Sequence, residues 1–252
     1  MATTLRSLFG LSILLLANAG CDGGDDSDAR SGPKAVGGSS AAGGSGGTGG
    51  TAALPEGVPL TPLDGWVDGA SNTVGIQGAM FSYADSTSGM SMIEDFTGAN
   101  ACITGTAAKV DMMCTIEPPA TDCYGTFWGA AIGLNLNQPI DMSTMEGADP
   151  MPYDATALTG FAFEITGSMV PASLRFKVED GTNEYCTPAT VPVKAGANTV
   201  SFEQLVTNCW TKGGTPASGA KSSLLKVSWQ VVTNAMSTVP FDFCVSNVRA
   251  ME

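Results

Sequence analysis

The chain has 252 residues, of which 43% are hydrophobic and only 14% are charged. This composition excludes a disordered chain, which lacks apolar residues, and a coiled coil, which is rich in ion pairs. A net charge of -13 opposes binding to the phosphates of nucleic acids. No histidine is present, so imidazole bases and the commonest zinc ligand are missing. We therefore expect no nucleic-acid partner and no enzymatic activity.

Residues 1–20 have the pattern of an export signal, with a positive charge ahead of an apolar run at 11–16. The run is about half the roughly 20 residues that a membrane-spanning helix needs. Segment 19–21, Ala-Gly-Cys, resembles the lipobox of bacterial lipoproteins, although residue 18 is Asn where the motif usually has Leu. Segment 17–19, Ala-Asn-Ala, also fits an ordinary signal-peptidase site. We expect a lipoprotein signal peptide with lipidation at Cys21, or a secreted protein if that cysteine is not lipidated.

The segment that follows is rich in glycine and serine. Residues 21–53 begin with acidic side chains and continue as GGSSAAGGSGGTGG, which is typical of a flexible linker with a reach of roughly 30 Å. Residues 54–252 then form one domain. This organisation predicts a lipid-anchored protein of the cell envelope or cell surface, with the outer membrane favoured.

Seven cysteines are present, and lipidation of Cys21 leaves six for pairing in an oxidising compartment. Three disulfides are expected, although many connectivities are open. No C-x-x-C spacing indicates a metal site instead. Our working assignment pairs Cys114 with Cys123, Cys186 with Cys209, and Cys102 with Cys244.

Eight segments show period-two alternation or short apolar runs between turn residues, which is typical of strands. They are 73–84, 102–110, 128–137, 160–166, 173–179, 198–205, 224–232 and 241–248. The pattern predicts an all-β, two-sheet antiparallel β-sandwich (jelly roll) of about eight strands. Helical turns are expected within 136–159 or near 203–207.

Alternation also assigns faces, because residues two apart in a strand point the same way. The expected core residues are Phe161, Phe163, Ile165, Leu174, Phe176, Val178, Leu225, Val227, Trp229 and Val231. The expected outward residues are Ala162, Glu164, Thr166, Arg175, Lys177, Lys226, Ser228 and Gln230.

The segment 128–137 has one face of large residues and one of small or amide residues. The large face is Trp128, Ala130, Ile132, Leu134 and Leu136, and the other is Gly129, Ala131, Gly133, Asn135 and Asn137. Small outward residues permit close approach by a ligand, a loop or an aromatic side chain. A glycan groove and a covering loop at 136–159 both remain open.

Six motifs stand out together in the domain. They are GIQGAMFSYAD from Gly75, CYGTFWGAAIGLNLNQ from Cys123, YDATALTGFAFEITG from Tyr153, LRFKVED from Leu174, VSFEQL from Val200 with Cys209-Trp210, and VPFDFCVSNV from Val239. Over about residues 60–250 they resemble carbohydrate-binding modules with the galactose-binding-like jelly-roll fold, and tethered bacterial lipoproteins. The resemblance implies non-catalytic binding of a polysaccharide in a groove on one sheet.

A sugar ring stacks its apolar face on aromatic side chains and needs polar partners for its hydroxyls. The candidate ligand-binding residues are Asn135, Glu164, Arg175, Lys177 and Gln230 as polar partners, with Tyr124, Tyr185 and Trp210 as aromatic platforms. An ordinary solvated strand face is the alternative for each polar position. Tyr185 and Trp210 are equally compatible with packing against the neighbouring cysteines.

Related sandwiches often bind a structural calcium through an acidic pair in the last strand. Here Ser246 and Asn247 occupy the expected positions, which weakens the case for calcium. Other acidic residues remain as oxygen ligands: Asp64, Asp68, Asp85 and Asp242. No cofactor is expected, with calcium kept as an alternative.

Glycoside hydrolysis needs two carboxylates facing each other across a cleft. The pairs Glu94–Asp95 and Glu179–Asp180 consist of chain neighbours, which point to opposite faces of a strand. We therefore expect no hydrolase. The main alternative to glycan binding is a structural or protein-interaction lipoprotein of the cell envelope.

Overall fold

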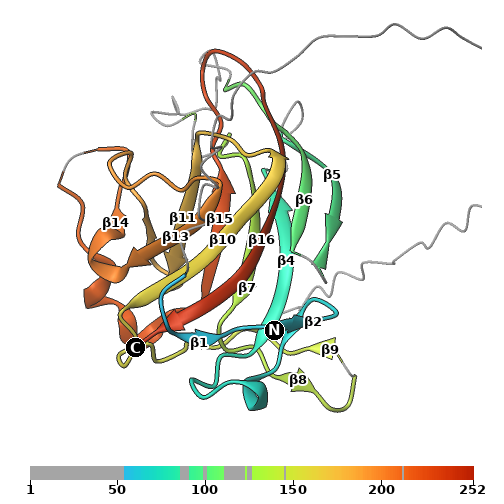
Figure 1. The fold of residues 1–252 in the computed structure, drawn as a ribbon, viewed down its shortest axis with the longest axis vertical. Helices are drawn as coiled ribbons and strands as arrows, with labels where there is room; N and C mark the ends of the chain where they lie inside the picture. The colour runs from blue at the N-terminus through green and yellow to red at the C-terminus, as the bar shows by residue number, and fades with distance from the viewer. Residues whose placement is uncertain are drawn as a thin grey trace, which may run out of the picture. The chain divides into compact units, whose positions relative to one another are not determined.

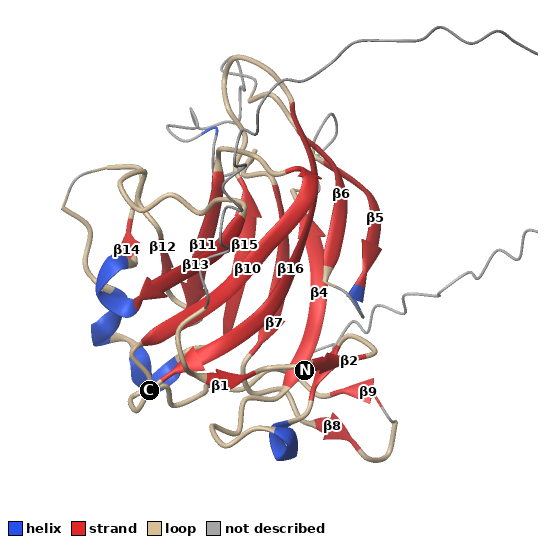
Figure 2. Ribbon diagram, in the orientation of Figure 1, coloured by secondary structure: helices blue, strands red, loops and turns tan. Residues whose placement is uncertain are grey.

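Two antiparallel sheets face each other around a shared apolar core in the computed structural model (Figures 1 and 2). The structure describes residues 54–85, 91–98, 101–110, 123, 127–144, 146–211 and 213–252. The predicted signal peptide, Cys21, the linker, Cys114 and Tyr124 lie outside these residues. The predicted all-β two-sheet sandwich is confirmed. In the described part of the chain, no helix has the length and apolar character needed to cross a membrane.

The smaller sheet has six strands in the order β13-β10-β16-β6-β5, and β1 also pairs with β16. Its strands are β1 (Val58–Pro59), β5 (Met92–Thr97), β6 (Cys102–Ala107), β10 (Gly160–Met169), β13 (Gly196–Ser201) and β16 (Val239–Met251). The long strand β16 is central, because it pairs with β1, β6 and β10.

The larger sheet has eight strands in the order β14-β12-β11-β15-β7-β4-β3-β2. They are β2 (Pro62–Leu63), β3 (Trp66–Val67), β4 (Gly78–Ala84), β7 (Ala130–Asn135), β11 (Leu174–Glu179), β12 (Glu184–Cys186), β14 (Val206–Thr207) and β15 (Lys226–Val231). A separate hairpin joins β8 (Ile140–Asp141) to β9 (Glu146–Gly147). The described 3-10 turns are η1 (Gly69–Ser71), η3 (Phe202–Gln204), η4 (Ala217–Gly219) and η5 (Lys221–Ser223).

Each of the eight predicted segments overlaps one main strand. The expected helical turn near 203–207 is confirmed by η3, whereas the described part of 136–159 holds the hairpin β8–β9. Neither β5 nor β12 was predicted from the sequence, and nor were the two-residue strands β1, β2, β3, β8, β9 and β14. β5 is an edge strand whose side chains are largely exposed, and β12 has only three residues, so neither shows a clear apolar alternation.

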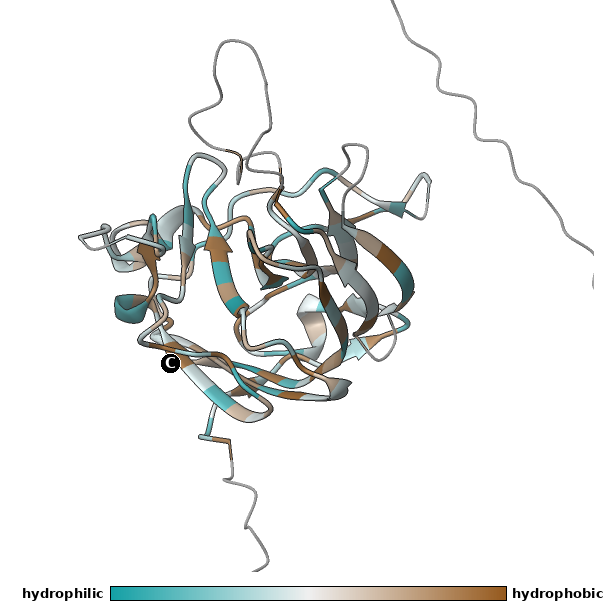
Figure 3. Cartoon of the chain, turned by 90° about the horizontal axis from the view of Figure 1, so that it is seen from above, coloured by the Kyte–Doolittle hydropathy of each residue, from teal (hydrophilic) through white to brown (hydrophobic). Residues whose placement is uncertain are grey.

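Aromatic side chains join the two sheets across the core. Phe163 on β10 lies edge-on to Trp229 on β15, with ring centroids 5.4 Å apart, and 5.0 Å from the ring of Phe176 on β11. Such pairs contribute about 0.5–1.5 kcal/mol each beyond the burial of their surface. Apolar and polar bands alternate along the strands (Figure 3). With one exception, the core residues predicted from 160–166, 173–179 and 224–232 are confirmed.

The exception is Leu225, whose prediction as a core residue is wrong. Leu224 is fully buried in the core instead, and Leu225 is partly exposed. Strand β15 begins only at Lys226, and Leu224 follows directly on η5. Its backbone pairs with Tyr153, so strand alternation does not extend back to these two leucines.

Two of the predicted disulfides are confirmed. Cys102 and Cys244 are bonded and directly opposed on β6 and β16, with Cα atoms 3.9 Å apart. Cys186 on β12 is bonded to Cys209, which follows β14. Cys123 also forms a disulfide, and its predicted partner lies outside the described residues.

Candidate functional site

Strand register builds a grid of side chains on the outward face of the larger sheet. One row across β11, β15, β7 and β4 is Arg175, Gln230, Ala131 and Tyr83, and the next row is Lys177, Ser228, Gly133 and Phe81. The small residues are Ala131 in the first row and Ser228 and Gly133 in the second, and the outer positions of both rows hold long or aromatic side chains.

An open cavity of about 760 Å³ lies on this face. Its walls come from β4, β11, β12 and β15, from the segment before β7 and from the segment after β14. The lining residues are Tyr83, Trp128, Arg175, Lys177, Glu184, Cys186, Trp210, Gln230, Val232, Thr233 and Asn234.

Tyr83 and Trp128 form an aromatic wall, with ring centroids 5.3 Å apart. The prediction that Trp128 points into the core with Ala130 is wrong, because Trp128 lines the cavity. Gly129 is the cause: its φ of +113° breaks the strand alternation, and a Cβ there would lie 1.9 Å from the carbonyl oxygen of Val231. The glycine thus turns the indole out of the core and onto the sheet surface.

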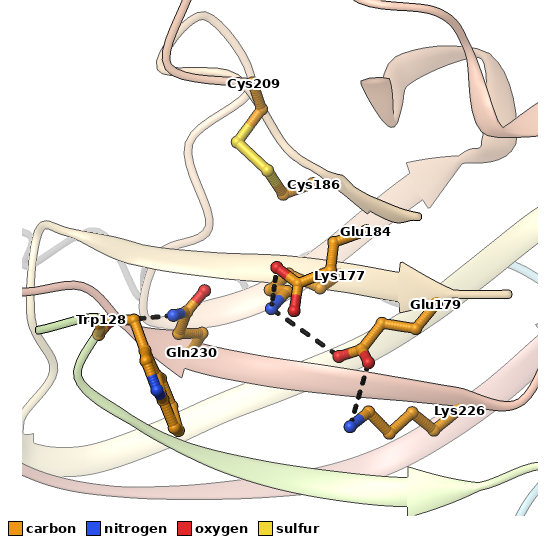
Figure 4. Close-up of polar contacts among 8 residues, drawn as sticks. All are labelled: Trp128, Lys177, Glu179, Glu184, Cys186, Cys209, Lys226 and Gln230. Atoms are coloured by element: carbon orange, nitrogen blue, oxygen red, sulfur yellow. Dashed lines mark hydrogen bonds and ion pairs between the residues drawn. A yellow bond between two sulfur atoms is a disulfide. The ribbon is translucent and has the colours of Figure 1, made fainter. Parts of the chain in front are cut away.

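Hydrogen bonds fix the backbone on both sides of this glycine. Gln230 Nε2 donates to the carbonyl oxygen of Trp128 over 2.9 Å, and Thr233 Oγ1 donates to that of Phe127 over 2.6 Å. The Gly129 amide donates to the buried carboxylate of Asp85 over 2.7 Å. Trp128 is therefore held by its backbone while its ring stays at the cavity wall (Figure 4).

Trp210 forms another part of the cavity lining and is 62% exposed. It follows Cys209, whose disulfide to Cys186 fastens this segment to β12 (Figure 4). Asn208 has a φ of 49°, and its carbonyl accepts the amide of Thr211, so the indole stands on a tight turn. The disulfide thereby holds an exposed aromatic side chain beside the cavity.

Two lysines and two glutamates form a connected ion-pair cluster. Lys177 Nζ lies 2.8 Å from Glu184 Oε2 and 3.7 Å from Glu179 Oε1, and Lys226 Nζ lies 3.0 Å from Glu179 Oε2 (Figure 4). Lys226 also stands 4.8 Å from the centre of the Tyr83 ring. Burial, followed by the charge of Glu179, raises the pKa of Tyr83.

Four predicted site residues come together here: Arg175, Lys177, Gln230 and Trp210. Asn135 lies on the same face but outside the cavity lining, and its Nδ2 donates to Gln138 Oε1 over 2.8 Å. It supports the loop after β7.

Glu164 and Tyr185 do not line the cavity, contrary to what the predicted site implied. Glu164 lies on β10 of the opposite sheet and accepts a hydrogen bond from Asn247. Tyr185 is only 6% exposed, belongs to the core and donates its hydroxyl to Asp180, so its ring offers no platform. It pairs with the core residue Val178, which places its side chain on the inner face of β12.

The sequence analysis missed Tyr83, Trp128 and Glu184. Tyr83 could have been identified from the sequence, because it lies two residues after Phe81 and both therefore share the outward face of β4. Trp128 could also have been identified, because the glycine that follows it indicates a break in the strand. Glu184 could not have been identified in this way, because the three residues of β12 are too few to show strand alternation.

Three of the four acidic candidate calcium ligands have other partners. Asp85 accepts bonds from Ser91 and Gly129, Asp68 caps η1, and Asp242 accepts from Thr104 and Ser168. Among the residues that the structure describes, no group of three or more His, Cys, Asp or Glu side chains is placed to hold a metal ion.

The site thus combines flat apolar rings with fixed hydrogen-bonding groups. No protein-family model and no curated protein matches the chain. Functional inference therefore depends on the side chains of this cavity.

Proposed function

We propose that the domain binds a polysaccharide, without catalysis, in the cavity on the outward face of the larger sheet. One observation carries the proposal: Tyr83, Trp128 and Trp210 line the same open cavity as the polar side chains of Arg175 and Gln230. A pyranose ring presents an apolar C–H face to an aromatic ring and a rim of hydroxyls to polar groups.

The chemistry of the cavity supports binding over hydrolysis. Glu179 and Glu184 are both engaged by lysine Nζ atoms within 3.0 Å. A hydrolase needs one carboxylic acid kept protonated and a second carboxylate on the opposite side of the scissile bond. Both carboxylates are therefore occupied by lysine side chains. The sandwich architecture also agrees with the likeness to jelly-roll carbohydrate-binding modules, which remains part of this proposal.

The proposal includes a lipid anchor at Cys21 and the linker 21–53, which together hold the domain at the cell envelope, with the outer membrane favoured. Intact-mass analysis of the mature chain from a bacterial host tests this part. A diacylglyceryl group on Cys21 as the first residue supports the anchor. Cleavage after Ala19 without a lipid contradicts it and indicates a secreted protein.

Titration calorimetry of the full chain against soluble polysaccharides, and pull-down on insoluble ones, tests glycan binding. Trp210→Ala and Trp128→Ala should each weaken binding by about tenfold or more, because each removes a stacking ring. Met142→Ala is the matched control, since Met142 is 80% exposed and lies outside the cavity lining. Equal affinity of all four proteins contradicts the site.

A protein partner is the second candidate function. Apolar side chains are exposed on Leu63 of β2, at 77%, and on Ile140 of β8, at 44%. Their hairpins are adjacent, because Trp66 reaches Gly147. Cross-linking in native envelopes tests this alternative, which is favoured if every polysaccharide fails to bind and Leu63→Ser abolishes a specific cross-link.

A further inference from the structure

Arg175 differs from the other cations of the cavity region. Lys177 and Lys226 are both within 3.0 Å of a glutamate oxygen. Among the residues that the structure describes, the guanidinium of Arg175 has no ion pair and no hydrogen bond. It nevertheless lines the cavity together with Trp128, Trp210 and Gln230.

The charges around Arg175 leave it uncompensated. Lys177 and Lys226 balance Glu179 and Glu184 in the cluster, so Arg175 adds one net positive charge at the cavity. The whole chain carries -13, so this local charge opposes the overall sign of the protein. Burial lowers the pKa of Arg175, and no carboxylate offsets that effect.

A partly buried cation without a partner costs free energy that a ligand anion offsets on binding. The guanidinium has a planar set of N–H donors that matches the two oxygens of a carboxylate. Aromatic rings line the same cavity, so an anion that suits it is attached to a ring that stacks on them. A sugar with a carboxylate as its C6 group has both parts.

We propose that the polysaccharide bound by this domain contains uronic acid residues, with Arg175 binding the sugar carboxylate and the aromatic side chains binding the ring. The inference rests on the proposed function and gives its ligand class. Gln230, which neighbours Arg175 in register and anchors Trp128, couples the carboxylate subsite to the aromatic wall.

The test compares polygalacturonate and alginate with methyl-esterified polygalacturonate and neutral glucans, by titration calorimetry on the full chain. Methyl esterification removes the charge and keeps the ring. We expect the acidic chains to bind about 10- to 100-fold more tightly than the ester, and raised salt to reduce this preference. Trp210→Ala should weaken both acid and ester.

Variants of Arg175 separate charge from geometry. Arg175→Gln should abolish the preference for the acid over the ester, and Arg175→Lys should keep part of it, because the charge remains and the planar donor set is lost. Lys194→Gln is the charge-matched control, since Lys194 is exposed and outside the cavity lining. Thermal unfolding of each variant shows whether the fold is retained.

The outcomes distinguish the two proposals. If neutral glucans bind through Trp210 and the acidic chains do not, the uronic acid assignment is wrong and the glycan site stands. If sulfated glycans bind and carboxylated ones do not, the cavity recognises sulfate, which also overturns it. If no polysaccharide binds, the proposed function itself fails.

Discussion

The side chain of Phe81 on β4 covers Gly133 on β7, the residue directly opposite in register. A Cβ added at residue 133 would lie only 2.6 Å from Cζ of the Phe81 ring. The small outward face of 128–137 left a ligand, a loop and an aromatic side chain as alternatives. At Gly133 the aromatic ring of Phe81, on the neighbouring strand, occupies this space.

Gly133→Ala should therefore destabilise the domain by about 1–3 kcal/mol, because the new methyl group forces the Phe81 ring out of its place. Urea unfolding measures the change. Gly219→Ala is the control, since a Cβ at residue 219 meets no atom within 4 Å. In a Phe81→Leu background the cost of Gly133→Ala should become smaller. An undiminished cost there assigns the strain to the backbone instead.

Asp85→Asn should cost about 1–3 kcal/mol of stability. Asp85 is 3% exposed, and its two carboxylate oxygens accept from the Ser91 amide and hydroxyl and from the Gly129 amide. Asparagine has one acceptor oxygen, so its amide group faces a donor and leaves a buried N–H unpaired. Urea unfolding against Asp149→Asn, an exposed position, checks the effect, and equal midpoints would contradict it.

The two described disulfides should differ in what their removal changes. Replacing Cys102 and Cys244 by Ala opens a link between residues 142 positions apart, which costs about 5 kcal/mol in the chain-entropy model. Replacing Cys186 and Cys209 opens a link of 23 positions and costs about 3 kcal/mol. Only the second change should also weaken glycan binding, because Trp210 loses its support. Unfolding and calorimetry on both double variants decide this.

Stability should fall as the pH rises above about 10, the pKa of an unfolded tyrosine. Burial, together with the charge of Glu179, raises the pKa of Tyr83 in the folded chain. Between the two pKa values the unfolded chain loses the phenol proton and the folded chain keeps it, so unfolding becomes easier by up to about 1.4 kcal/mol per pH unit.

Urea unfolding from pH 8 to pH 11 measures this slope. Tyr83→Phe should make it shallower because phenylalanine has no proton to release. Tyr153 and Tyr185 also have raised pKa values, with burial as the main cause, so part of the slope remains in that variant. An identical slope in the variant and the parent chain would show that the phenol of Tyr83 does not contribute.

The sandwich could be predicted because large apolar residues recur at every second position of its main strands. The alternation in 173–179 places Phe176 inside and Arg175 outside, as the structure does. Period-two alternation holds only while the backbone stays extended. It fails at Gly129, with positive φ, and at Leu224, which leaves a 3-10 turn. Both errors occur where a strand begins.

The site was harder to predict because it depends on register between strands distant in sequence. Arg175, Gln230 and Tyr83 lie in one row only because β11, β15, β7 and β4 are neighbours in the sheet. Alternation shows that Glu164 and Arg175 both face outward, but it does not show that they belong to opposite sheets. The motifs in the sequence indicated residue types for a site but not this order in the sheet.

Strand β1 determines how the domain responds to a mechanical load. Its two residues pair with Ala250 and Arg249 of the smaller sheet, whereas the cavity lies on the outward face of the larger one. A pull on residue 54 first meets this two-residue pairing and then the bond from the Leu60 amide to Val248. Leu60 is the first buried side chain on that path. Tension applied to the N-terminal segment is therefore resisted first by the two-residue pairing of β1 and then at Leu60, on the smaller sheet.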